Sequence, residues 1–254
     1  MAKQLLIYES AVPVNAATHG SLSFEPVPDY TFAASINAVP LTAVEIIAAA
    51  PEYAIVFVAS GDDVMPVAVL GVRTDQNLFL SSDSRWEAKY VPAFIRRYPF
   101  VFSMSADQKT LTLCIDETHP GFNRDGRGER LFDEAGKPTP YVDRVLGFLK
   151  DYQAHAERTR SFGKRLKDLG LLEAMEAVVT TPGGEQVPLR GFLAVSRDRL
   201  RALEGEKLAE LASTDELELI YLHLFSMRNF NDVKDRFVGA IGKSTAAVEA
   251  TAAS

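Results

Sequence analysis

Residues 52–72 read EYAIVFVASGDDVMPVAVLGV and contain two short apolar runs, EYAIVFVAS and VMPVAVLGV, on either side of GDD. Short runs rich in valine favour buried strands, because β-branched side chains pack well on a pleated sheet. Glycine and aspartate between two such runs are typical of a tight turn. The stretch therefore predicts a hairpin of two largely buried strands.

Further strands are expected downstream of this hairpin. The run NLFLS at 77–81 predicts a third strand, and residues 100–105 and 110–116 flank the polar turn ADQK as a second hairpin would. The chain up to residue 118 is therefore expected to be rich in strands.

The segment before the hairpin is less regular. Residues 1–40 are rich in proline and predict an irregular arm laid over the core. Thr42 and Glu45 have the spacing of a capping box, in which each side chain bonds the other residue's backbone amide. They predict a short helix that ends near Ala50, before Pro51.

The second half has mainly helical patterns. Apolar residues recur at spacings of three and four from Tyr141 to Tyr152, after Thr139 and Pro140, which suit a helix start. They predict one helix, or a pair broken near Gly163, that ends at Gly170. The later strand predictions are a hairpin of 176–181 and 185–189 around PGG and a further strand at 191–195. Two helices are then predicted: a short one capped by Ser196, and one that runs from a second capping box at 213–216 to Met227.

These elements predict an α+β fold with one shared core, because helices do not alternate regularly with strands. The expected organisation is a single domain over residues 1–238, followed by a disordered tail of small residues at 239–254. Within the domain we expect a strand-rich part at 1–118, a loop at 119–139 and a mainly helical part at 140–238.

Composition argues against several classes of partner. The net charge is −7 and the isoelectric point is near 5.2, which argues against nucleic acid as a partner. No apolar run reaches the roughly 18 residues that span a bilayer, and the N-terminus does not resemble a Sec signal peptide. The expectation is a cytoplasmic protein without membrane insertion; the alternative is a cell-surface protein exported by a non-Sec route.

The sequence assigns no catalytic residues. The four histidines are scattered and the single cysteine, Cys114, lies in an apolar strand pattern, so no metal site is expected. The hydrolase, metalloprotease, kinase, phosphate-loop and Rossmann motifs are all missing, and no cofactor is expected. His223 is predicted to have a hydrogen-bonded structural role. Glu129 and Asp133 lie in the glycine-rich loop 117–140, where they could be paired carboxylates of a glycosidase or a metal site, but charged loop residues are normally only solvated.

One tract is denser in binding chemistry than the rest. RWEAKYVPAFIRRYPFVF at 85–102 contains the only tryptophan, and its two prolines predict a strand, a short helix at 91–97 and a strand. In one interpretation its aromatic residues are core and its arginines pair with acidic neighbours. In the other, Arg96 or Arg97 anchors a carboxylate or phosphate beside an aromatic wall of Trp86 or Tyr98.

Several motifs resemble those of the bacterial SapC family over about residues 5–238: AVEI, YAIVFV, PVAVLGV, NLFL, YVPAFIRRYPFVF, GERLFDEAGKPT, LRGFLAVSRDRLRAL and YLHLFSMRNF. The family is named from an S-layer locus and has no agreed biochemical activity. Related genes lie near those of TonB-dependent receptors, so the resemblance implies a link to the cell surface or to outer-membrane uptake.

Two functional hypotheses follow. The first is a soluble accessory or binding protein, linked to the cell surface, S-layer or outer-membrane uptake, that recognises a protein or peptide partner without catalysis. The alternative is an enzyme that modifies a peptide or surface polymer with Arg96 or Arg97 and loop carboxylates. The oligomeric state is left open, and the candidate binding residues are Trp86, Arg96, Arg97, Tyr98, Arg127, Glu129 and Asp133.

Overall fold

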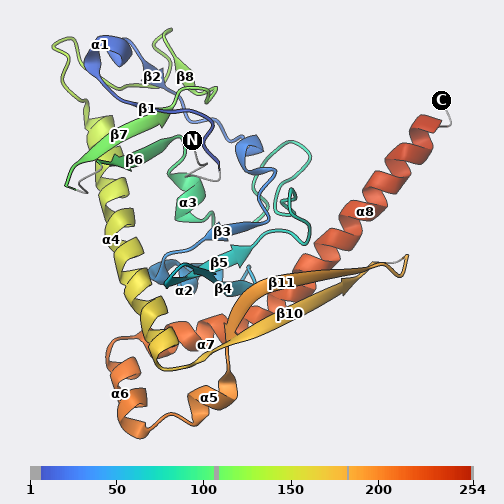
Figure 1. Cartoon of the computed structure of the whole chain (residues 1–254). Coiled ribbons are helices and arrows are strands. Elements are labelled where there is room, and N and C mark those ends of the chain that lie inside the picture. The colour runs from blue at the N-terminus through green and yellow to red at the C-terminus, as the bar shows by residue number, and fades with distance from the viewer. Residues whose placement is uncertain (1–6, 106–108, 182, 253–254) are drawn as a thin grey trace.

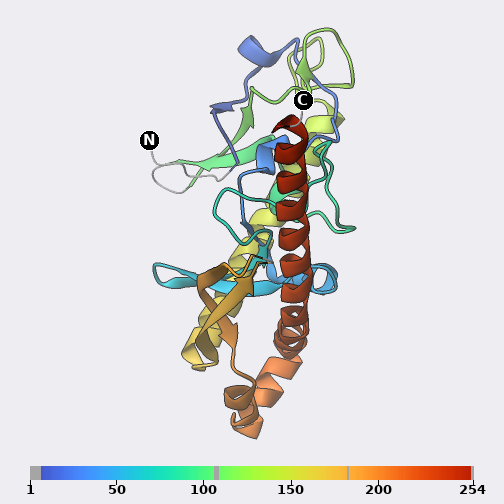
Figure 2. The same cartoon turned by 90° about the vertical axis from the view of Figure 1, so that its right-hand side faces the viewer.

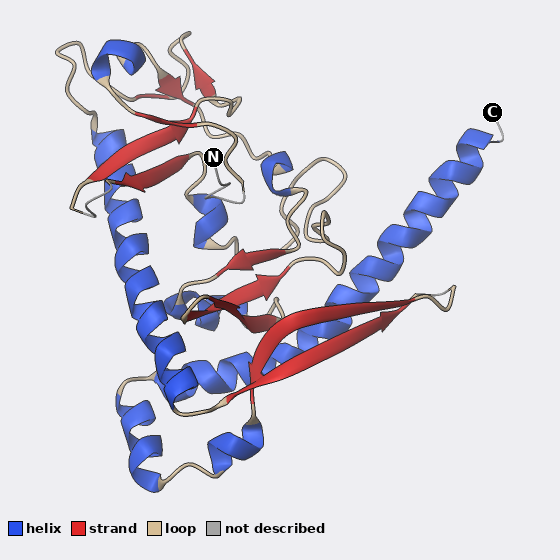
Figure 3. Cartoon of the chain, in the orientation of Figure 1, coloured by secondary structure: helices blue, strands red, loops and turns tan. Residues whose placement is uncertain are grey.

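The protein has an α+β fold, as expected, with three small antiparallel sheets and a long helix that runs past two of them (Figure 1; Figure 3). The computed structural model describes residues 7–105, 109–181 and 183–252, with side chains up to Gly242.

The predicted central hairpin forms and lies inside a five-stranded sheet. Strand β4, Ile55–Ser60, pairs with β5, Asp63–Val69, in a register that places Ile55 opposite Ala68. The sheet order is β10-β11-β4-β5-β3, and the other strands are β3, Ala38–Pro40; β10, Leu172–Thr180; and β11, Gln186–Val195.

The third strand expected at 77–81 is wrong. The Asn77 side chain accepts a hydrogen bond from the Phe79 amide at 2.9 Å and donates one to the Ala33 carbonyl at 3.0 Å. An asparagine that bonds the backbone two residues on bends the chain into a turn. The strand expected around Trp86 is likewise reduced to a single bridge with Leu80.

A second sheet contains the predicted hairpin that follows the aromatic tract. Its order is β1-β7-β6, with β1, Ala11–Pro13; β6, Phe100–Met104; and β7, Leu111–Asp116. Most of the predicted turn ADQK lies outside the described residues.

The glycine-rich loop is more ordered than expected. Its two short strands, β8, Phe122–Asn123, and β9, Glu129–Arg130, both pair with β2, Ser23–Phe24, of the N-terminal arm. Four short helical segments complete this half of the chain: α1, Ala16–His19; η1, Thr31–Ala33; the pair η2, Ala43–Glu45, and α2, Ile46–Ala49; and α3, Ala93–Arg96. The capping box of Thr42 and Glu45 is present.

Helix α4, Pro140–Asp168, is one continuous helix, so the alternative of a break at Gly163 is wrong. It runs beside both the upper and the central sheets (Figure 1). Gly163 instead permits close packing, because a Cβ atom at this position would lie 1.8 Å from the Val64 carbonyl oxygen of β5.

Two further boundaries differ from prediction. Strand β11 continues through Gly191, whose φ of +85° bends it, so the separate strand at 191–195 does not exist. The second capping box is not formed, because the Ser213 hydroxyl donates to the Glu210 carbonyl at 2.8 Å instead. Helix α8 includes the segment from 239, in which alanine favours helix.

The remaining helices follow the long hairpin. They are α5, Arg197–Arg201; α6, Gly205–Ser213; α7, Glu216–Ser226; η3, Met227–Asn229; and α8, Phe230–Ala252. Figure 2 shows α8 as a long straight helix, and Figure 1 shows that its C-terminal part extends away from the rest of the molecule.

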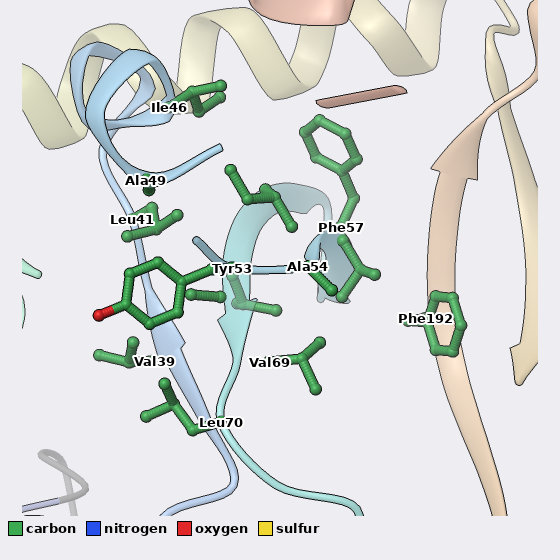
Figure 4. Packing of buried hydrophobic residues seen from close by; sticks show 14 of the residues in the cluster. Val39, Leu41, Ile46, Ala49, Tyr53, Ala54, Phe57, Val69, Leu70 and Phe192 are labelled. Atoms are coloured by element: carbon green, nitrogen blue, oxygen red, sulfur yellow. The ribbon is translucent and has the colours of Figure 1, made fainter. Parts of the chain in front are cut away.

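Buried apolar side chains form two clusters. The larger one draws on both halves of the chain, as a shared core requires: it includes Tyr53, Phe57 and Phe192 (Figure 4), and Phe162 of α4 also belongs to it. The smaller one lies in the upper part and includes Phe24, Phe100 and α4 residues such as Leu149. Helix α4 contributes to both clusters and so connects the two parts, while the division into one domain and a tail stays a prediction.

Replacing Gly163 by alanine is expected to lower the free energy of unfolding by about 2 kcal/mol, because the new methyl group forces α4 away from β5. Gly147→Ala is the matched control in the same helix. No heavy atom lies within 4 Å of a Cβ there, so this variant should gain about 0.5 to 1 kcal/mol from helix propensity. Urea unfolding measures both; equal effects of the two variants would contradict the close-packing role.

Candidate functional site

A pocket of about 420 Å³ lies between α3, the first half of α4, strand β6 and the N-terminal arm. We call it the arginine pocket, because Arg96, Arg97 and Arg144 all line it. Its volume lies within the range of small-molecule and peptide side-chain sites. Aromatic side chains form a large part of its wall: Phe24, Tyr30, Phe32, Tyr98, Phe100, Tyr141 and Phe148.

Arg97 is the buried cation of this pocket. The residue is 9% exposed, and its guanidinium carbon lies 4.1 Å from the centre of the Phe94 ring and 4.9 Å from that of Tyr152. Within the described residues no carboxylate forms an ion pair with it, and its Nε has no hydrogen-bond partner. Buried charges are usually paired with an opposite charge, whereas this guanidinium is held by cation–π contacts with three rings and by side-chain hydrogen bonding with Tyr8.

The tyrosines around Arg97 do not neutralise it. Burial raises the pKa of Tyr8 and of Tyr152, and in both cases the nearby arginine only partly offsets that rise. Both hydroxyls therefore remain protonated near neutral pH. Rings over a guanidinium give cation–π attraction, but they supply no net negative charge.

Arg96 differs from Arg97 in its exposure and in the rings that it contacts. Its side chain is exposed, its Nε donates to the Val91 carbonyl at 2.9 Å, and its guanidinium carbon lies 5.4 Å from the Phe148 ring centre and 5.7 Å from that of Tyr90. Arg96 also pairs with no carboxylate among the described residues. The interpretation that the arginines of the tract pair with acidic neighbours therefore fails for Arg96 and Arg97, but it holds for Arg85, which forms an ion pair with Asp83 at 2.8 Å.

Tyr98 belongs to the aromatic wall, as expected. Its ring stacks on Phe32 with centroids 4.0 Å apart, and burial raises its pKa to about 12, with the Asp116 carboxylate adding to the effect. The tyrosine therefore acts in the pocket as a neutral aromatic surface. Trp86 lies elsewhere, because its Nε1 donates to the Tyr53 hydroxyl at 2.7 Å beside the larger core.

The polar side of the pocket contains two residues that the sequence did not single out. The Asp29 carboxylate accepts bonds from the hydroxyl and amide of Thr31, which lower its pKa. His119 Nδ1 accepts the Gly121 amide at 2.9 Å, and burial lowers the pKa of this histidine. The neutral ring therefore carries its proton on Nε2 and can donate a hydrogen bond.

The three predicted loop residues do not line the pocket. Arg127 lies 3.8 Å from Glu25, and Asp133 accepts the Lys137 amide at 2.8 Å within its own turn. Glu129 forms an ion pair with Arg144 at 3.2 Å, so it reaches the pocket only through that arginine. Of the predicted binding residues, Arg96, Arg97 and Tyr98 line the pocket, and their role in binding stays a prediction. The sequence had no signal for the arm residues that complete the wall.

Other chemistry is sparse in the part of the chain that the structure describes. No group of three histidine, cysteine, aspartate or glutamate residues there could hold a metal ion. Cys114 is buried, and burial raises the pKa of its thiol. None of the described helices is both long enough and apolar enough to cross a bilayer.

The fold and the pocket define an α+β protein with a ligand-sized cavity that combines aromatic walls with an unpaired buried arginine. The SapC family model matches residues 14–233, and the chain belongs to that family. Neither the curated proteins nor the solved structures gave a match.

Proposed function

We propose that the protein is a non-catalytic binding protein that recognises a protein or peptide partner through the arginine pocket. The observation that carries this proposal is the unpaired, nine-tenths buried guanidinium of Arg97. A carboxylate that enters the pocket gains charge-assisted hydrogen bonds and removes an uncompensated buried charge. The aromatic walls favour an apolar group next to that carboxylate.

The pocket supports the binding hypothesis more than the enzyme alternative. That alternative needs Arg96 or Arg97 beside loop carboxylates such as Glu129 or Asp133, and neither of these lines the pocket. The carboxylate present, Asp29, is held by two hydrogen bonds from Thr31. The pocket thus offers two arginines that have no carboxylate partner among the described residues, together with a neutral histidine and rings, and this combination suits recognition of an anion.

The family's S-layer locus gives the proposal a cellular setting. We place the protein as an accessory to cell-surface or outer-membrane uptake machinery. It would bind its partner from the cytoplasmic side or, in the alternative, after export to the surface.

Affinity capture from the native host tests the proposal with Arg97→Met, which keeps an unbranched side chain among the rings but removes the charge. We expect the wild type to enrich one reproducible partner and the variant to lose it, with an unchanged or higher melting temperature, because an unpaired buried cation is removed. Arg228→Met is the matched control: this exposed arginine also covers a ring, with its guanidinium carbon 4.0 Å from the Phe225 centre, and lies outside the pocket.

Competition identifies the group that is recognised. N-acetylphenylalanine, which carries a carboxylate and a ring, should release the captured partner, whereas N-acetylphenylalanine amide should not. Two results would contradict the proposal and make Arg97 a structural residue. The first is that Arg97→Met still captures the partner. The second is that its free energy of unfolding falls by about 3 kcal/mol or more, as in a variant with a broken internal ion pair.

A further inference from the structure

Helix α7 and the turn of η3 that continues it expose four side chains on one face: Glu218, Tyr221, Phe225 and Arg228. Their spacing by three and four places them one above the other along the helix. Tyr221 is 48% exposed and Phe225 is 45% exposed, which is a large exposure for two neighbouring aromatic side chains. We call these four residues the α7 stripe.

The stripe points away from the rest of the molecule. His223 lies at the middle of the helix on the opposite side, where its ring bonds the Val195 amide and the Ile55 carbonyl of the central sheet. Each residue turns a helix by about 100°, so residues two positions before and after His223 face away from that sheet. Helix α7 also contacts α2 and α6, and it lies between them in Figure 1.

The two ends of the stripe carry opposite charges without a partner of opposite charge. Within the described residues, neither the Glu218 carboxylate nor the Arg228 guanidinium forms an ion pair. The guanidinium carbon of Arg228 instead lies 4.0 Å from the centre of the Phe225 ring, which places it on the same face. The stripe thus consists of an acidic end, two rings and a basic end.

This order of side chains is complementary to itself under a twofold axis. When two α7 helices lie antiparallel with the axis level with His223, positions equally far before and after His223 face each other. Tyr221 then meets Phe225 of the second copy, and Glu218 meets Arg228 of the second copy. Every contact occurs twice, which gives two aromatic pairs and two ion pairs. A parallel arrangement places like charges together instead.

We infer that the α7 stripe is a dimerisation surface, on which a second copy of this chain binds in the antiparallel direction. The stripe is about 15 Å long, at a rise of about 1.5 Å per residue. Such a small contact gives a weak dimer, with a dissociation constant on the order of tens of micromolar. The arginine pocket is built from other elements, so the inference goes beyond the proposed function and does not depend on it.

Sedimentation of the full chain at low salt, up to about 500 µM, tests this surface. We expect wild type to pass from monomer to dimer over this range. Glu218→Arg and Arg228→Glu should each raise the dissociation constant about tenfold, because each places like charges at both ends of the contact. An equimolar mixture of the two variants should associate again, because every pair in the mixed dimer joins opposite charges.

The double variant separates dimerisation from a role within the helix. An acidic residue near the start of a helix and a basic one near its end also suit the helix dipole. Combining Glu218→Arg with Arg228→Glu opposes the dipole at both ends, so this variant should unfold at the lowest urea concentration of the set. It restores both intermolecular ion pairs, however, and should dimerise like wild type.

Matched controls cover the charge and the apolar part. Glu134→Arg makes the same change in net charge at an exposed loop position and should leave the dissociation constant unchanged. Phe225→Ser should abolish the dimer, whereas Val178→Ser, at a residue that is 51% exposed on β10, should not affect it. Each copy contains a complete arginine pocket, so loss of the dimer, including in Arg228→Met, should leave capture through Arg97 unchanged.

Three results would overturn the dimerisation surface. Wild type that remains monomeric up to about 500 µM has no such contact. A dimer that is indifferent to Phe225→Ser and to both charge reversals forms through another surface. Failure of both the mixture and the double variant to associate would show that the charges do not pair in the antiparallel arrangement. None of these results changes the proposed function, which host capture with Arg97→Met tests separately.

Discussion

Replacing Glu45 by alanine is expected to lower the free energy of unfolding by about 4 kcal/mol, because two amides and two hydroxyls lose their acceptor. One carboxylate oxygen accepts the Tyr90 hydroxyl at 2.8 Å and the Ala93 amide at 2.6 Å, and the other accepts the Thr42 amide at 2.7 Å. The capping box predicted from sequence thus also holds the start of α3, which carries Arg96 and Arg97.

Two further variants make this prediction specific. Glu45→Gln keeps the shape but turns one acceptor into a donor, so we expect a loss of about 2 kcal/mol. Glu52→Ala is the control: Glu52 also accepts two backbone amides, those of Lys89 and Tyr90, but in a half-exposed setting where water replaces it, so about 1 kcal/mol is expected. Urea unfolding near neutral pH gives the three values, and an equal cost for Glu45→Ala and Glu52→Ala would contradict the account.

Local sequence patterns predicted the elements that depend on neighbouring residues. The apolar runs around GDD form β4 and β5, the box of Thr42 and Glu45 is present, and the periodic stretch after Pro140 is α4. The errors occur where a distant contact decides the structure. Gly163 suggested a helix break by composition, but its role is set by the Val64 backbone about a hundred residues earlier.

The candidate site shows the same limit. The aromatic tract pointed to Arg97, but its status as an unpaired cation depends on rings from three separate regions: Tyr8, Phe94 and Tyr152. Nothing in the local sequence distinguishes a guanidinium in such a cage from one in an ion pair. Likewise, Phe24 and Phe32 of the irregular arm become pocket walls only because the arm lies against β6 and the glycine-rich loop.

His223 has the structural role predicted for it, and its position explains the role. Strands β4 and β11 pair directly at Phe57 and Leu193. Two residues away on each strand, Ile55 and Val195 are joined through the histidine ring instead. Nε2 accepts the Val195 amide at 3.0 Å, and Nδ1 donates to the Ile55 carbonyl at 2.9 Å. The ring from α7 thus replaces a backbone hydrogen bond inside the central sheet, and it does so only in its neutral form.

The second large effect is a loss of stability in acid that depends on this ring. Burial lowers the pKa of His223 from 6.5 to about 4, so unfolding takes up a proton between these values. The stabilisation is complete above about pH 6.5 and is lost as the pH falls toward 4. It amounts to about 3 kcal/mol in full and about 2 kcal/mol between about pH 7.5 and pH 5.

His223→Gln isolates the contribution of the ring, because the glutamine amide can donate to the Ile55 carbonyl and accept the Val195 amide without titrating. At neutral pH we expect this variant to be less stable than wild type, because glutamine packs imperfectly beside Phe57. Between neutral pH and pH 5, its free energy of unfolding should fall by about 2 kcal/mol less than that of wild type. Urea unfolding across this pH range measures the difference, in which the contributions of His119, Asp29 and the other titrating groups cancel. Parallel pH profiles for wild type and His223→Gln would show that protonation of the inserted ring does not limit stability. Profiles that converge toward pH 5 would show that protonation of His223 weakens the link between the strands of the central sheet.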